Sequence, residues 1–207
     1  MRKKVIISII LTLVIAGGIG YFFWNKVVEA KEMDLAYQNK LVDTLGLIET
    51  STTSSSMLAV TYQEYWGEII DRSISFSSLS EGLNIDESTL EDMTDYSQRA
   101  HFMNNVTALK QGEFDLVISM VRLAKKEDTN LVLAQHDSIT KAISDLKNPS
   151  EKFQNNYNSL LEIYEIYDTF VSLSTSPTGS YIEYSKNINS TFENLSSKTK
   201  TTKLQIN

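Results

Sequence analysis

The chain is 207 residues long and has a formal net charge of −7, with all 26 acidic residues placed after Trp24. An acidic chain of this kind repels phosphate backbones, so its charge excludes nucleic acid as an expected partner. The absence of cysteine excludes disulfides, thiolate metal sites and cysteine nucleophiles, and the low counts of 2 prolines and 8 glycines favour long helices.

The first predicted element is a transmembrane helix over residues 5–24. This stretch carries no charge, and at about 1.5 Å per residue it spans the roughly 30 Å hydrocarbon core of a bilayer. It ends in an aromatic cluster suited to the membrane interface, made of Tyr21, Phe22, Phe23 and Trp24. Residues 1–24 are therefore predicted to form a cytoplasmic tip and an anchor that contacts membrane lipid through residues 5–24.

Basic residues predict the direction of this segment. Arg2, Lys3 and Lys4 precede it, so the positive-inside rule places the N-terminus in the cytoplasm and the rest of the chain outside the membrane. A signal peptide cleaved after Ala30 is the alternative, because residues 28–30 resemble a processing site. The length of the apolar run and its bulky aromatic end favour an anchor that is retained.

Apolar residues at alternating spacings of four and three predict an exported helical domain over residues 25–197. Helices are expected, in chain order, over residues 25–78, 86–126, 130–147, 149–173 and 180–195. A break in the first helix is conceivable within residues 50–56, which are serine and threonine. The polar residues 198–207 are expected to fray. The predicted fold class is all-α: one N-terminal transmembrane helix, then an up-and-down bundle of four or five helices with coiled-coil-like packing.

Motifs for catalysis, cofactors and metals are missing from the sequence. No glycine-rich phosphate loop, GxSxG elbow or HExxH pattern occurs. His101 and His136 have no ligand partner at helical spacing, so both are expected at the surface or at an interface. Glu162, Glu165 and Asp168 share one helix edge, where solvation is expected and a bound cation is the alternative. We therefore expect no enzyme, no cofactor and no metal site.

An aromatic group on the first long helix is the first candidate for partner recognition. It consists of Tyr62, Tyr65 and Trp66. Aromatic residues are common at recognition surfaces, yet at helical spacing they more often fill a core. The core interpretation is favoured, and recognition of a partner remains the alternative.

A mid-bundle polar layer is the second candidate. If a turn near Leu83 folds the first two predicted helices into an antiparallel hairpin, Trp66 faces Ala100 and Ser55 lies near Gln111. That register gathers five polar side chains, namely Thr52, Ser55, Asn104, Thr107 and Gln111. Such a layer is expected to be satisfied or solvated, and a ligand cavity is the alternative.

Together these features predict a membrane-anchored, non-enzymatic envelope protein, bacterial by its composition. Its exported bundle is expected to bind another envelope protein or a cell-wall component. The alternative is a ligand-binding or sensor-like bundle that acts through a separate membrane partner. Small residues recur every four positions at Ser8, Thr12, Ala16 and Gly20, a pattern that allows a homo-oligomer through the anchor or that reflects chance.

Overall fold

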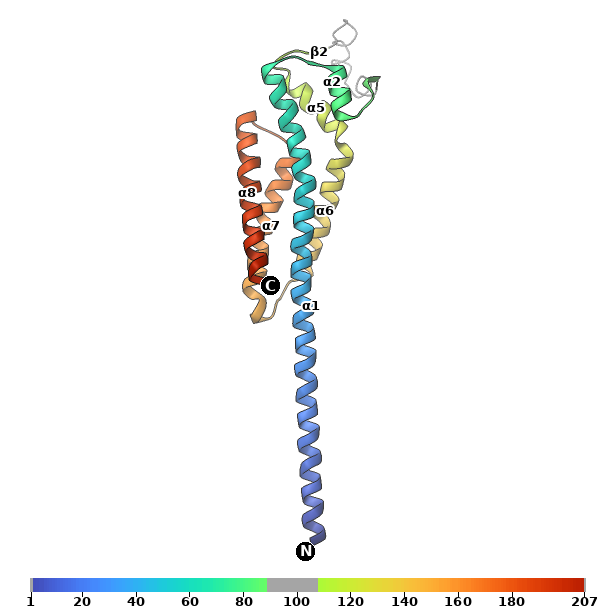
Figure 1. Cartoon of the computed structure of the whole chain (residues 1–207), viewed down its shortest axis with the longest axis vertical. Coiled ribbons are helices and arrows are strands. Elements are labelled where there is room, and N and C mark those ends of the chain that lie inside the picture. Colours follow the sequence, from blue (N-terminus) through green and yellow to red (C-terminus); the bar gives the residue numbers. More distant parts are fainter. Residues whose placement is uncertain (1, 89–107, 207) are drawn as a thin grey trace.

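One helix, α1 (Arg2–Asp71), runs through the computed structural model and organises it (Figure 1). The structure describes the backbone of residues 2–88 and 108–206 and the side chains of residues 29–88 and 109–206. The predicted anchor and its interfacial aromatic residues therefore lie where no side chains are described. Within the part whose side chains are described, no helix combines the length and the apolar character needed to cross a membrane.

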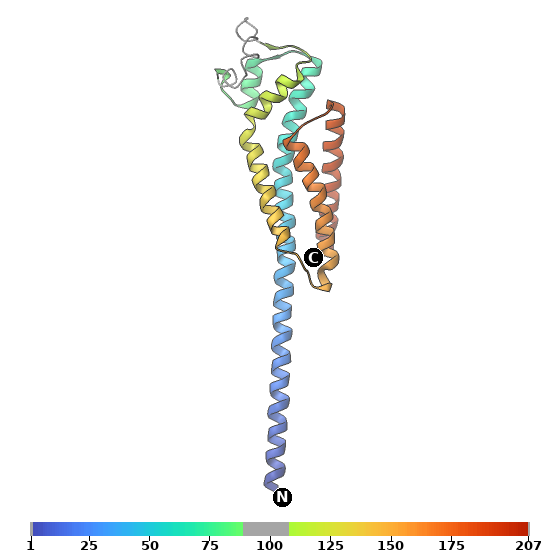
Figure 2. The same ribbon diagram turned by 180° about the vertical axis from the view of Figure 1, so that it is seen from behind.

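Four helices surround the C-terminal half of α1, which confirms the predicted all-α helical bundle. Figures 1 and 2 both place α1 between α6 on one side and the α7–α8 pair on the other. All of them pack against α1, and the bounds in chain order are α5 (Phe114–Ala124), α6 (Lys126–Ser144), α7 (Gln154–Thr175) and α8 (Tyr181–Ile206). The core therefore lies along α1, where Leu41, Leu45 and Ile48 are fully buried.

The base of the bundle is joined to α1 by polar contacts. Lys152 forms an ion pair with Asp34 at 3.0 Å, and the Tyr37 hydroxyl donates to the Leu146 carbonyl at 2.8 Å. The Gln38 amide donates to the carbonyl of Ile206 at 2.7 Å, which fixes the end of α8. Before this level α1 extends alone, away from the bundle (Figure 1).

The hydroxyl-rich run at residues 50–56 does not break α1. Thr50, Thr52 and Thr53 each donate a hydrogen bond to the carbonyl four residues earlier, at 2.7–3.1 Å. These bonds satisfy the hydroxyls inside the helix, so they do not compete with it for other backbone geometries. The Ser51 hydroxyl instead reaches across the core to the Tyr167 hydroxyl at 2.8 Å.

The tip of the bundle differs from the single long helix that was predicted to continue to residue 78. α1 ends at Asp71 and is followed by a short strand, β1 (Ile74–Ser75), and by α2 (Phe76–Leu83). Ser75 caps α2, because its side-chain oxygen accepts a hydrogen bond from the Ser78 amide at 3.1 Å. Serine favours caps over helix interiors, so this serine-rich stretch starts a new element.

The second predicted helix, over residues 86–126, is wrong between residues 108 and 113. Here β2 (Ala108–Leu109) pairs antiparallel with β1, so that Leu109 lies opposite Ile74. Gly112 follows with a φ of 90°, a conformation that residues with a Cβ rarely adopt and that ends any helix. Residues 89–107, including Ala100, lie outside the described residues, so the predicted contact between Trp66 and Ala100 stays a prediction.

Helix boundaries in the C-terminal half also shift. The fourth helix was expected to begin at residue 149, but Asn148 adopts a φ of 62°, and Ser150 precedes the short 3-10 turn η1 (Glu151–Phe153), after which α7 begins at Gln154. A capping box opens α8 at residue 180, where the last helix was predicted to begin. The Glu183 amide donates to the Ser180 hydroxyl at 3.3 Å, and the Ser180 amide donates to the Glu183 carboxylate at 3.4 Å.

The polar tail predicted to fray is helical through Ile206, the end of α8. Thr199, Thr202 and Ile206 are buried there, and Lys203 forms an ion pair with Glu49 of α1. Small hydroxyl-bearing side chains can pack closely against a neighbouring helix, so polar composition alone does not exclude a docked helix. The tail therefore belongs to the bundle.

Alanine substitutions at two helical glycines should change the stability of the fold in opposite directions. A Cβ at Gly82 would lie 2.0 Å from the hydroxyl of Tyr65, a buried side chain, so Gly82→Ala should lower the free energy of unfolding by about 1–3 kcal/mol. A Cβ at Gly46 would meet nothing within 4 Å, so Gly46→Ala should raise it by about 0.5–1 kcal/mol. Denaturant unfolding of both variants tests the pair, and changes of the same sign would contradict this packing.

Candidate functional site

A pocket of about 450 Å³ lies near the tip of the bundle, between α1, α5 and the loop that joins α7 to α8. We call it the tip pocket. α1 contributes Trp66, and the loop contributes residues 177–179. α5 provides the longest wall, formed by Phe114, Asp115, Ile118, Ser119 and Arg122. The volume falls in the range that is usual for sites of small organic ligands.

Trp66 is a rigid part of this wall. Its indole ring packs against Tyr184, with ring centroids 5.5 Å apart, and against Tyr181 at 6.3 Å. Only 7% of Trp66 is exposed, so its position is fixed by the core while one edge borders the tip pocket. A fixed aromatic surface can contact a ligand at little entropic cost.

Two opposite charges line the same pocket. Asp115 and Arg122 both belong to α5, where they are seven positions apart, a rise of about 10 Å along the helix axis. Within the described part of the chain, neither side chain forms an ion pair with the other or with a third residue. The pocket therefore presents one positive and one negative group without net charge.

Buried tyrosine hydroxyls lie behind Arg122. Burial raises the pKa of Tyr62, and the neighbouring Arg122 guanidinium partly offsets that effect. Burial also raises the pKa of Tyr184, and the proximity of Tyr62 adds to it. The hydroxyls of Tyr62 and Tyr184 are buried, and neither forms a hydrogen bond of ordinary geometry with a described residue. Arg122 therefore lies close to the buried Tyr62 hydroxyl and also lines the tip pocket.

The three predicted recognition aromatics are part of the core, as their helical spacing indicated. Tyr62, Tyr65 and Trp66 are all less than 10% exposed. The Tyr65 hydroxyl lies close to Gly82 of α2. Trp66 additionally borders the tip pocket, so this residue belongs both to the core and to the pocket wall.

The predicted mid-bundle polar layer does not assemble as proposed. The side chain of Gln111 is exposed and donates to the Ile70 carbonyl at 2.6 Å, far along α1 from Ser55. The cause is the β1–β2 pairing, which brings the start of the returning chain to the end of α1. Thr52 is buried with its hydroxyl on the Ile48 carbonyl, and the Ser55 hydroxyl is buried without a described partner. Asn104 and Thr107 lie outside the described residues.

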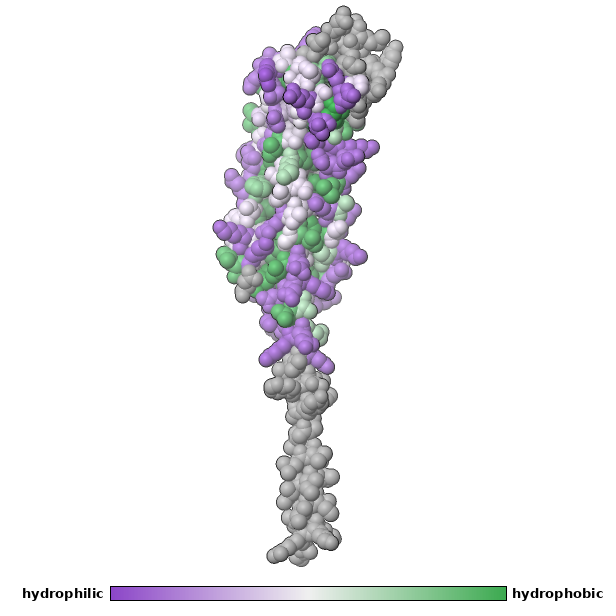
Figure 3. Space-filling view, turned by 45° about the vertical axis from the view of Figure 1, so that its right-hand side comes forward, coloured by the Kyte–Doolittle hydropathy of each residue, from purple (hydrophilic) through white to green (hydrophobic). Residues whose placement is uncertain are grey.

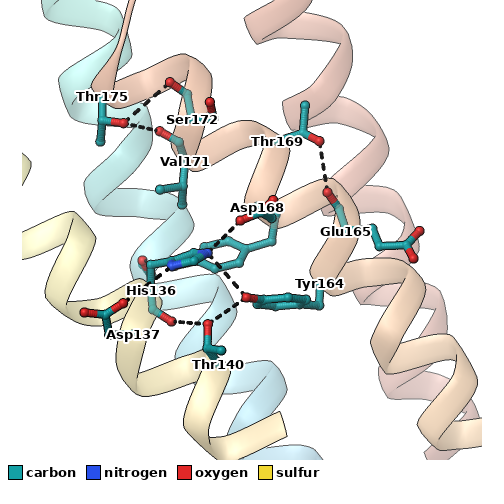
Figure 4. Close-up of polar contacts among 12 residues, drawn as sticks. His136, Asp137, Thr140, Tyr164, Glu165, Asp168, Thr169, Val171, Ser172 and Thr175 are labelled. Carbon is teal, nitrogen blue, oxygen red and sulfur yellow. Dashed lines mark hydrogen bonds and ion pairs between the residues drawn. The ribbon is translucent and has the colours of Figure 1, made fainter. Parts of the chain in front are cut away.

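A polar cluster between α6 and α7 was not predicted (Figure 4). The Nε2 of His136 lies 2.8 Å from the Asp168 carboxylate and 3.4 Å from the Tyr164 hydroxyl. The Thr140 hydroxyl lies 2.6 Å from that of Tyr164, and the imidazole stacks on Tyr164 and Tyr167 with centroids 5.9 and 5.7 Å away. Neighbouring antiparallel helices bring these residues together, which spacing along one helix cannot reveal.

This cluster links α6 to α7. No serine or threonine hydroxyl bonds a ring nitrogen of His136, so the nucleophile–base contact of a hydrolase is missing among the described residues. The three acidic residues of the predicted helix edge do not converge on one point. Asp168 contacts His136, and Glu162 forms an ion pair with Lys198 of α8. Glu165 points away from the imidazole in Figure 4. The described residues contain no group of three or more acidic, histidine or cysteine side chains placed to hold a metal.

The rest of the described surface is mixed in character. Figure 3 shows hydrophilic and hydrophobic side chains interspersed over one face of the bundle. A groove of about 250 Å³ follows α1 and α6 past Leu47 and Ala134, and another of about 220 Å³ lies beside Met57 and Leu131. The second groove contains Lys125 and Asp128, but these two side chains form an ion pair with each other at 3.5 Å. Neither groove is lined by an aromatic residue, as the tip pocket is by Trp66. The tip pocket is therefore the stronger candidate site.

Comparisons with protein-family models, curated proteins and solved structures return no match to this chain.

Proposed function

We propose that this chain is a membrane-anchored, non-enzymatic envelope protein whose exported helical bundle binds another protein or the cell wall. The observation that carries the proposal is the continuity of α1. The helix that contains residues 5–24 also packs against α5, α6, α7 and α8. An uncharged segment at one end of a helix and a bundle at the other suit a domain held at a set distance from a bilayer.

The length of α1 supports a role in binding at a distance. From Trp24 to Asp34, where Lys152 joins α1 to the bundle, the helix rises about 15 Å. From Trp24 to Trp66 it rises about 60 Å, so the tip pocket would be displayed well beyond the lipid headgroups. The acidic character of the chain after Trp24 supports the same placement, because it disfavours contact with an anionic lipid surface.

The topology has a direct test in cells. Protease added to intact, wall-stripped cells should degrade everything after about residue 25, because the basic N-terminus holds the bundle outside. Replacing Arg2, Lys3 and Lys4 by asparagine should remove the bias and leave part of the protein protected. Full protection of the unmodified protein would overturn the outside placement. Release of the bundle into the medium would show cleavage after Ala30.

A second candidate function is ligand binding or sensing through a separate membrane partner. The tip pocket favours it, because Trp66, Asp115 and Arg122 converge there from two helices. In this candidate the bundle binds a small molecule, and a partner protein in the membrane carries the signal. Both candidates require a ligand or partner on the exported bundle and need no catalysis.

A further inference from the structure

We propose that the tip pocket binds a short peptide, with its free C-terminal carboxylate at Arg122 and its N-terminal ammonium group at Asp115. The inference rests on the proposed binding function of the bundle, but it does not depend on which side of the membrane the bundle occupies. It is carried by the charges, the apolar wall and the size of the pocket.

The spacing of Asp115 and Arg122 along α5 sets the expected length of the ligand. Their backbone positions are about 10 Å apart along the helix axis. An extended chain covers about 3.3–3.6 Å per residue, so the two ends of a tripeptide match this separation. Because neither side chain has an ion-pair partner among the described residues, a ligand would not have to displace an existing salt bridge.

A simple ion can satisfy only one of the two charged residues. An inorganic anion at Arg122 cannot also contact Asp115, about 10 Å away along α5, and a cation at Asp115 cannot also contact Arg122. A zwitterion satisfies both groups at once. The guanidinium presents a planar fork that suits a carboxylate, and on its inner side it lies beside the Tyr62 hydroxyl, which limits its freedom.

The apolar wall accounts for the middle of the ligand. Ile118 lies between the two charged residues at positions three and four residues away, which puts it on the same face of α5. α1 contributes the indole of Trp66 to the same pocket. A tripeptide with an apolar central residue would place that side chain between Ile118 and Trp66, and a pocket of about 450 Å³ accommodates it.

Binding can be followed through Trp66 in the full chain. The sequence contains 2 tryptophans, so Trp24→Phe leaves Trp66 as the single fluorescent indole. In detergent, this variant should show saturable binding of the tripeptide Ala-Leu-Ala, both by fluorescence and by calorimetry. N-acetylation or C-amidation of the peptide should each weaken binding about tenfold or more, because each removes one charge-assisted contact.

Charge-removing variants assign each end of the peptide. Arg122→Gln should bind the free and the amidated peptide alike, and Asp115→Asn should bind the free and the acetylated peptide alike. The matched controls Lys141→Gln and Asp145→Asn lie near the opposite end of the bundle and should keep both discriminations. Thermal unfolding of every variant excludes loss of fold as the cause.

Two outcomes would overturn the proposal. One is no saturable binding of Ala-Leu-Ala at millimolar concentration by calorimetry. The other is a variant pattern in which Arg122→Gln and Asp115→Asn still distinguish the blocked peptides as the unmodified pocket does. Either result would leave the protease experiment on topology unaffected, so failure of this inference is distinguishable from failure of the proposed function.

Discussion

Leu45→Ala should lower the free energy of unfolding by about 2–5 kcal/mol, whereas Leu47→Ala, two residues further along α1, should change it by less than about 1 kcal/mol. Leu45 is 0% exposed and Leu47 is 46% exposed. Truncating Leu45 removes buried methyl groups and leaves a cavity at the centre of the bundle. Truncating Leu47 removes atoms that are already half in water.

The two variants share a helix, a chemical change and nearly the same helix propensity, so Leu47→Ala is the control for the effect of alanine on α1 itself. Denaturant unfolding followed by circular dichroism measures both. If both variants lost the same amount of unfolding free energy, α1 would not pack against the other helices in the orientation described. A loss confined to Leu45→Ala supports α1 as the element on which the bundle is built.

The orientation of α1 was predictable from the sequence. Leu41, Ile48 and Ile69 belong to the series of residues in α1 that are spaced by four and three, and each is 0% exposed. Leu160 belongs to a similar series in α7 and is also 0% exposed. Periodicity predicts these buried positions because the residues that form one face of a helix lie only three or four positions apart in the sequence.

Contacts between distant segments were not predictable in the same way. Gln111 was wrongly predicted to lie near Ser55, because the β1–β2 pair and the turn at Gly112 bring Gln111 to Ile70 at the end of α1. A two-residue strand leaves almost no periodic signal in the sequence. The contact between His136 and Asp168 needs α6 and α7 side by side. The tip pocket needs three segments at once, so Asp115 and Arg122 stood out only after folding brought Trp66 next to them.

The bundle should lose stability at alkaline pH, above about pH 10. Burial raises the pKa of Tyr167 from 10.0 to about 12, against the lowering effect of its bond to Ser51. Between these two values the unfolded chain has released the tyrosine proton and the folded chain has kept it. The unfolded state therefore binds fewer protons, and the free energy of unfolding falls as the pH rises. Tyr167 should contribute a loss on the order of 2 kcal/mol by about pH 12.

Tyr184, whose pKa burial also raises, should add to this alkaline loss. Tyr167→Phe and Tyr184→Phe test the two contributions, since each should make the decline of stability between about pH 10 and 12 less steep.

At pH 7 the two variants should differ. Tyr167→Phe leaves the buried Ser51 hydroxyl without its partner and should lower the free energy of unfolding by about 1 kcal/mol. Tyr184→Phe removes a buried hydroxyl that no described residue hydrogen-bonds, so it should leave stability unchanged or raise it. Denaturant unfolding from pH 7 to 12 measures both effects. A slope unchanged in both variants would show that other groups cause the alkaline loss.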